Sequence, residues 1–216
     1  GSFRAAALRG HAAVTPFAGG VFESATVALM DADLAAFENS LPHTRVALEV
    51  DVRPQSDAIG GTFNATNGEP GTYAEQRLPI TRAAGHYRFA NDSLALSELQ
   101  IDFPGDGRAS GEATINVAAP GAPSRWRLDV RDLDLAQLHP TLIKTRLRGS
   151  LKADIDGARQ IVEGDVAEAS LAIGFAATYA ERRLDVTRFR ARAAGGTLAG
   201  TGRLLFDASR AFEVAL

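Results

Sequence analysis

The chain has 216 residues, of which 45% are hydrophobic and 23% are charged, and its formal net charge is −3 at pH 7. These values are typical of one large or two small globular domains, and they exclude the basic surface that nucleic-acid binding requires. The chain contains no cysteine and no run of about 18 apolar residues, which excludes disulfides, thiolate metal sites and membrane-spanning helices.

Both ends of the sequence indicate a fragment of a longer chain. It begins with Gly1 and Ser2, a pair typical of a cloning remnant, and it stops inside the apolar run AFEVAL. We therefore expect any targeting or membrane segment of the parent to lie outside this sequence.

Short helical turns are predicted at two related places. In 31–42, DADLAAFENSLP, three apolar residues follow Asp33 at helical spacing, and Asp33 is a candidate N-cap. The segment 132–143 repeats this spacing after Asp134. Each is expected to form one or two turns.

The remaining segments alternate apolar and polar residues, which is typical of half-buried strands. In VALEVDV, 46–52, the valines and Leu48 share one face, and Glu49 and Asp51 lie on the other. Segments rich in Gly, Pro, Asn and Asp separate these runs. The sequence predicts an antiparallel meander. The same alternation occurs in 125–131, 147–155, 171–179 and 198–206.

The alternation slips by one residue at three places, near Ser97, Asp132 and Thr187. A slip turns every later side chain to the wrong face unless an extra residue is accommodated. We therefore predict bulges or sharp bends at these positions, which would curl the sheet.

Two internal repeats are present. The phrase TYAEQRLPITR at 72–82 returns as TYAERRLDVTR at 178–188. At a different shift, 101 residues, 31–45 aligns with 132–146 and 8–14 with 109–115, and 198–204 is a weaker third copy. Repeats predict a stacked architecture. We interpret 1–216 as one continuous β domain with approximate units 8–108 and 109–216, and the doubled phrase as part of the repeated unit.

The strands together have one apolar face, and no predicted helix is long enough to cover it. Either the sheet closes on its own side chains, as in a sandwich or solenoid, or it curls into a U-shaped trough that holds another apolar molecule. The residues predicted to line such a groove are Val46, Leu48, Val50, Leu96, Ile101, Ile115, Leu128, Val130, Leu147, Leu151, Leu171, Ile173, Phe175, Leu184, Val186, Leu198 and Leu204.

Catalysis is not indicated by any motif. The four histidines are scattered and form no metal-binding pattern, and no Walker loop, GxSxG or paired-carboxylate signature occurs. The acidic clusters DADL and DLDL lack the glycine and glutamate of a calcium loop and are interpreted as turn residues. The predictions are no enzyme activity, no cofactor and no metal.

Arginines at 188, 190 and 192 form an alternating basic stripe. Two readings are open for it: contact with anionic headgroups, or an ordinary solvated outer face.

The motifs resemble one family. DLDL steps, strands of the form LxGxLxAxxxG, and GGxLxGxG strands, here LRGSLKADIDG at 147–157 and GGTLAGTG at 195–202, are similar to the repeats of the TamB branch of the AsmA-like proteins. The resemblance covers most of 128–206 and, more loosely, 8–117, where GGTFNATNGEPG at 60–71 and AAGHYRFAND at 83–92 depart from it.

The resemblance implies an all-β fold, a repetitive antiparallel sheet curled into a U-shaped trough with an apolar interior. It implies a periplasmic location, with the parent anchored in the bacterial inner membrane. Phospholipid acyl chains are the implied cargo, moved between the inner and outer membranes, and a TamA-like outer-membrane barrel is the implied partner. The alternative reading is a scaffold that captures β-strands for outer-membrane protein assembly without carrying lipid.

Overall fold

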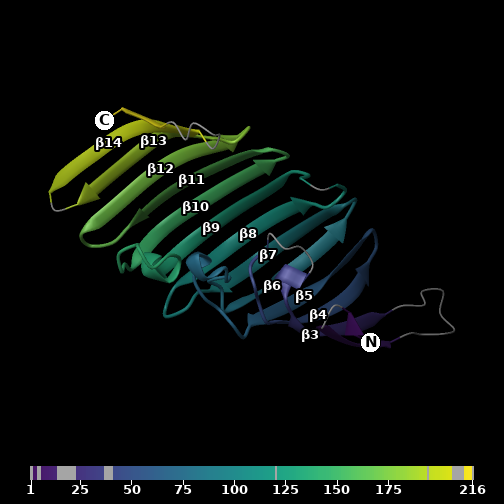
Figure 1. The fold of residues 1–216 in the computed structure, drawn as a ribbon. Helices are drawn as coiled ribbons and strands as arrows, with labels where there is room; N and C mark the ends of the chain where they lie inside the picture. The colour runs from purple at the N-terminus through teal and green to yellow at the C-terminus, as the bar shows by residue number, and fades with distance from the viewer. Residues whose placement is uncertain are drawn as a thin grey trace.

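The protein is described by a computed structural model, which covers residues 2–3, 6–13, 23–36, 41–119, 121–193, 195–205 and 212–215. The described part is all-β, with three short 3₁₀ turns as its only helical elements. All its strands belong to one antiparallel sheet whose order follows the chain, so each strand pairs with its sequence neighbours (Figure 1). The predicted meander is confirmed.

Fifteen strands are described, and thirteen of them have eight or more residues. Short edge strands, β1 and β15, complete the two ends of the sheet. The strands are β1 Ser2–Phe3, β2 Ala6–Ala13, β3 Ser24–Ala32, β4 Val46–Gln55, β5 Ala58–Asn67, β6 Arg82–Ala90, β7 Ser93–Asp102, β8 Arg108–Asn116, β9 Ser124–Leu133, β10 Leu147–Asp156, β11 Arg159–Ala167, β12 Leu171–Ala180, β13 Arg183–Ala193, β14 Gly196–Leu205 and β15 Phe212–Ala215. The 3₁₀ turns are η1 Leu34–Ala36, η2 Tyr73–Glu75 and η3 Leu135–Gln137.

Bulges occur at all three predicted places. The β7 register against β8 shifts between Leu96 and Leu99, and the β13 register against β14 shifts between Val186 and Phe189. In β9, Asp132 is the extra residue and has a φ of 52°. A fourth bulge in β3, at Asp31 with a φ of 56°, was not predicted. Each extra residue keeps the later apolar side chains on the same face and adds twist to the sheet.

The 101-residue repeat corresponds to six strands. β4 and β10 align residue for residue, since Val46 and Gln55 lie 101 positions before Leu147 and Asp156. β2, β3 and β5 align with β8, β9 and β11 to within two residues at either end. The third copy begins at β14.

The doubled phrase does not follow this repeat. At 72–78 it forms η2 inside the connection between β5 and β6, whereas at 178–184 it forms the end of β12, a turn and the start of β13. The strand predicted at 171–179 is confirmed as β12, whereas 72–78 contains the 3₁₀ turn η2. The connection 68–81 is much longer than its counterpart 168–170. The two copies of the phrase therefore lie in different surroundings, and tertiary context decides the conformation of each.

The true structural signature of the repeat is a set of hydrogen bonds at one rim of the sheet. Asp33 Oδ1 accepts from the backbone N–H groups of Ala35 at 3.1 Å and Thr44 at 2.9 Å, and the Thr44 hydroxyl donates to the Ala32 carbonyl at 3.2 Å. Asp134 and Thr145 make the same three bonds at 3.1, 3.0 and 2.9 Å. We refer to each set as a rim clasp.

The rim clasps account for the predicted short helices. Asp134 is the N-cap of η3, and Asp33 accepts from the first turn of η1 in the same way. Each turn is a single 3₁₀ turn, and residues 37–40 lie outside the described part. The sequence identities at Thr44 and Thr145 therefore reflect these bonds.

Three glycines lie where the backbone of a neighbouring strand approaches too closely for a side chain. A Cβ added to Gly61, Gly111 or Gly149 would overlap a backbone carbonyl oxygen of the neighbouring strand. Flat antiparallel neighbours do not approach in this way, so the contacts mark creases at which only glycine fits. The creases help to curl the sheet into a U-shaped trough with an apolar interior.

Candidate functional site: the apolar face of the sheet

Cross-strand register shows that one face of the sheet is apolar from β2 to β14. Directly paired residues point to the same side, so one line of partners can be followed across thirteen strands. No member of this line is polar. In order they are Leu8, Leu29, Leu48, Ala65, Ala83, Ile101, Ala109, Val130, Gly149, Val166, Ile173, Ala191 and Leu198.

All seventeen residues predicted to line a groove lie on this face. Ile101, Val130, Leu147 and their neighbours belong to the line just described or to the rows beside it. Three of the seventeen are buried, namely Ile101, Val130 and Leu147, whereas Leu198 is 47% exposed and the others are half-buried. The register therefore brings them onto one surface, although the chain spreads them over eight strands.

The middle of this face is filled by the protein's own side chains. Leu99, Val130, Leu147 and Val166 are each at most 8% exposed and form one cluster. The connection 68–81 adds to it, because Pro79 is fully buried and Ile80 packs against the cluster. A single sheet has no second layer to bury these residues, so their burial comes from the curl of the sheet and from this connection.

A lane of half-buried side chains remains beside the cluster. Leu96, Leu128, Leu151 and Phe175 keep part of their surface accessible. Further along the same face Ile59 is 44% exposed. The two alternatives left open by the sequence are therefore both realised in part: the trough is filled near the clasp rim and open beyond it.

Sequence reasoning missed many members of the apolar face. Ala65, Ala83, Ala109 and Ala113 have small side chains that give weak alternation, and Gly111 gives none. Phe63 was missed because it lies between Gly60 and Asp92, where the strand pattern is obscured by glycine and asparagine. The register of the neighbouring strands is the signal that identifies them.

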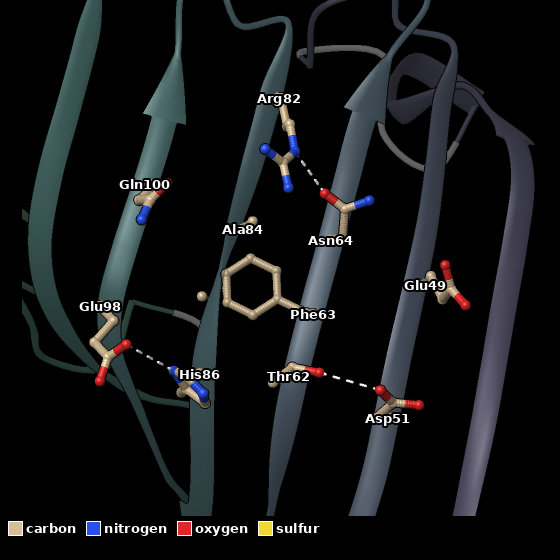
Figure 2. Close-up of a pocket in the computed structure, with 11 residues that line it drawn as sticks. Glu49, Asp51, Thr62, Phe63, Asn64, Arg82, Ala84, His86, Glu98 and Gln100 are labelled. Carbon is tan, nitrogen blue, oxygen red and sulfur yellow. Dashed lines mark hydrogen bonds and ion pairs between the residues drawn. The ribbon is translucent and has the colours of Figure 1, made fainter.

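The opposite face is polar and its groups bond to one another. A hollow of about 420 Å³ lies on this face over β4 to β7, and its lining residues are drawn in Figure 2. In it Arg82 donates to Asn64 at 2.7 Å and Thr62 donates to Asp51 at 3.2 Å. Beside them His86 lies 3.4 Å from Glu98. Such reciprocal pairing is typical of a solvated sheet face.

The described residues contain no cluster of His, Asp or Glu side chains placed to hold a metal ion. The carboxylate of Asp33 is fully engaged by Ala35, Thr44 and His43, and these bonds hold the pKa of Asp33 below its usual value, the Thr44 N–H having the largest effect. The DADL motif therefore has a structural role in the clasp.

Two further carboxylates are held ionised by arginines. Arg148, 2.8 Å from Asp132, lowers the pKa of Asp132 by hydrogen bonding, and Arg146 adds to the effect. Arg203 at 2.9 Å and Arg183 at 2.6 Å lower the pKa of Asp185.

We predict that the protein is destabilised by acid. A carboxyl group whose pKa is lower in the folded state contributes stability above its unfolded pKa, here 3.8, and that stability is lost as the pH falls through the folded value. The urea midpoint should be nearly constant from about pH 7 to 5 and fall below about pH 4. In Asp132→Asn the fall should be shallower. An equally steep fall in that variant would contradict the assignment.

Within the described residues, none of the helical elements has the length and apolar character needed to cross a bilayer. No protein-family profile, curated protein or solved structure matches the chain.

Proposed function

We propose that the apolar face binds the acyl chains of phospholipids, and that the chain is a segment of a periplasmic, bridge-like protein that carries lipid between the inner and outer membranes. The observation that supports this most directly is the unbroken line of apolar partners from Leu8 to Leu198, which crosses thirteen strands with no polar side chain. The middle members of this line are buried in the central cluster, whereas Leu128, Leu151 and Phe175 in the lane beside it stay half-buried. An ordinary core needs burial, so apolar side chains that stay accessible favour an external apolar ligand.

Acyl chains fit the chemistry of this lane. Each methylene group that leaves water contributes about 0.8 kcal/mol, and a lipid tail needs no hydrogen-bond donor or acceptor. Headgroups would stay in solvent beyond the open part of the trough. Transport is then diffusion between neighbouring sites of similar depth, along Leu128, Leu151 and Phe175.

The resemblance to TamB-type repeats supports the same proposal and extends it. It favours a parent chain anchored in the inner membrane and a TamA-like barrel as partner in the outer membrane. No catalytic step is required, because the lipid is moved without chemical change.

The proposal is tested by lipid crosslinking to a photoreactive residue placed at Phe175, in purified protein supplied with phospholipid vesicles. Ile173→Asp puts a charge on the apolar face, and Ala176→Asp puts the same charge on the polar face of the same strand, beside Arg188. We expect Ile173→Asp to abolish crosslinking and Ala176→Asp to leave it intact. Unchanged crosslinking in folded Ile173→Asp would refute the proposal.

Because Ile173 packs against the central cluster, a second variant is needed in case the first does not fold. Leu198→Asp is on the same line of partners but 47% exposed, so the fold should tolerate it. Native mass spectrometry of the purified protein gives an independent reading, since retained phospholipid supports the proposal.

A strand-capturing scaffold is the second candidate, and the open sheet favours it. Among the described strands, β1 and β15 each pair with one neighbour only, and such an edge strand can pair with an extended peptide. A protein that carries no lipid and captures extended outer-membrane peptides would support this candidate and exclude the first.

A further inference from the structure

The polar face carries a second hollow whose composition differs from the rest of that face. It has a volume of about 460 Å³ and lies over β10 to β13. In one register row, Arg148 of β10 pairs with Ala167 of β11, Ala167 with Ala172 of β12, and Ala172 with Arg192 of β13. Two arginines therefore flank two alanines on the same surface.

The floor of the hollow is formed by small residues. Adjacent strands are about 4.8 Å apart, so the Cα atoms of Arg148 and Arg192 are separated by roughly 14 Å. The two alanines leave this space empty of long side chains, and in the next row the Asp165 carboxylate lies over Gly174. Long arginine side chains from both sides can reach over such a floor.

The hollow has an excess of positive charge in a protein whose net charge is −3. Arg148, Arg188, Arg190 and Arg192 line it, and Asp165 is the single carboxylate among its lining residues. Arg148 is paired with Asp132 at 2.8 Å and Arg188 with Asp165 at 3.4 Å.

Within the described ranges, two of these arginines have no partner of opposite charge. No carboxylate of the described residues lies within 4.0 Å of Arg190 or Arg192. On the same face, Arg125 is 3.3 Å from Asp154 and Arg127 is 3.5 Å from Glu112. The two unpaired guanidinium groups stand two residues apart on β13, about 7 Å between Cα atoms, and are free to bind the same anion.

We propose that this hollow binds a phosphate group, as a free phosphate compound or as the headgroup of an anionic lipid. Guanidinium groups present N–H donors in a planar fork that matches phosphate oxygens, and several of them around one small-residue floor favour a multivalent oxyanion. The site lies on the opposite face of the sheet from the apolar lane. It is therefore separate from the acyl-chain site, and neither depends on the other.

The first probe is inorganic pyrophosphate, titrated calorimetrically into the folded protein at low salt. We expect saturable binding that weakens as salt increases, because exposed charges are screened. Arg190→Gln combined with Arg192→Gln should weaken binding at least about tenfold, the loss of roughly 1.4 kcal/mol. The matched control, Arg125→Gln with Arg127→Gln, removes the same charge from paired arginines and should leave affinity within about twofold.

Weaker binding in the Arg190/Arg192 variant could also result from misfolding, and a variant expected to bind more tightly tests the site without this ambiguity. Asp165→Asn removes the carboxylate that lines the hollow and frees Arg188. Pyrophosphate should then bind several-fold more tightly. Weaker or unchanged binding in Asp165→Asn would count against the site.

Vesicles distinguish the two sources of phosphate. Co-sedimentation with phosphatidylglycerol vesicles, absent with phosphatidylcholine and lost in the Arg190/Arg192 variant, would identify a lipid headgroup. Pyrophosphate binding without vesicle binding would identify a free phosphate compound. The proposal is overturned if neither probe binds, or if both arginine pairs reduce binding equally, because the interaction is then a general charge effect.

Discussion

Gly111→Ala is expected to destabilise the protein by about 3 kcal/mol, a large effect for the addition of one methyl group. The new Cβ would overlap the backbone carbonyl oxygen of Arg127 and lie 3.1 Å from the Cα of Leu128. Backbone atoms cannot move aside as a flexible side chain can, so β8 and β9 would have to separate at the crease. Urea unfolding monitored by far-ultraviolet circular dichroism measures the loss.

The repeat provides a matched control for this variant. Gly10 lies 101 positions earlier, on the same face and in the equivalent place of β2, but a Cβ there would meet only the carbonyl oxygen of Thr26, at 3.5 Å. Gly10→Ala should therefore change stability by less than about 1 kcal/mol. Equal losses in the two variants would show that the crease at Gly111 does not have the geometry described.

Leu147→Ala should cost about 2–5 kcal/mol, because Leu147 is only 1% exposed and packs in the central cluster. Deleting its side chain leaves a cavity, since the surrounding strands are held by their backbone hydrogen bonds. Leu198→Ala removes the same atoms from a side chain of the same face that is 47% exposed, and should cost about 1 kcal/mol or less.

The difference in stability loss between the two leucine variants shows which part of the apolar face is buried and which part is accessible. A large loss at Leu147 with a small loss at Leu198 would be expected if the cluster is filled and the outer part of the face is accessible. Similar large losses would mean that the whole face is buried in solution, and the acyl-chain proposal would then have no surface to act on.

Much of the fold follows from alternation in segments with large apolar residues. Val46, Leu48 and Val50 fix the face of β4 without ambiguity, and the slips near Asp132 and Thr187 require the bulges that are found. Between Gly60 and Asp92 the same reasoning fails, because Gly and Asn carry no hydrophobic signal and interrupt the alternation around Phe63.

The polar features were harder to anticipate for a different reason. Thr44 and Thr145 were visible as repeated letters, but their role depends on hydrogen bonds across ten or more residues. The hollow between Arg148 and Arg192 depends on the register of four strands, which sets two alanines between the arginines. The basic stripe on β13 can be recognised in the sequence, but the alanines that lie beside it in space can be identified only from the strand register.

The unequal connections 68–81 and 168–170 leave from the same rim and return to it, so their lengths change neither the pairing of the strands nor the face on which a side chain lies. Repeat units of such a sheet can gain or lose residues in this connection while the pairing of the adjoining strands is unchanged. A search for a constant period would then overlook related units. Comparison of strands one by one, anchored on the aspartate and threonine of each rim clasp, is the better way to count them.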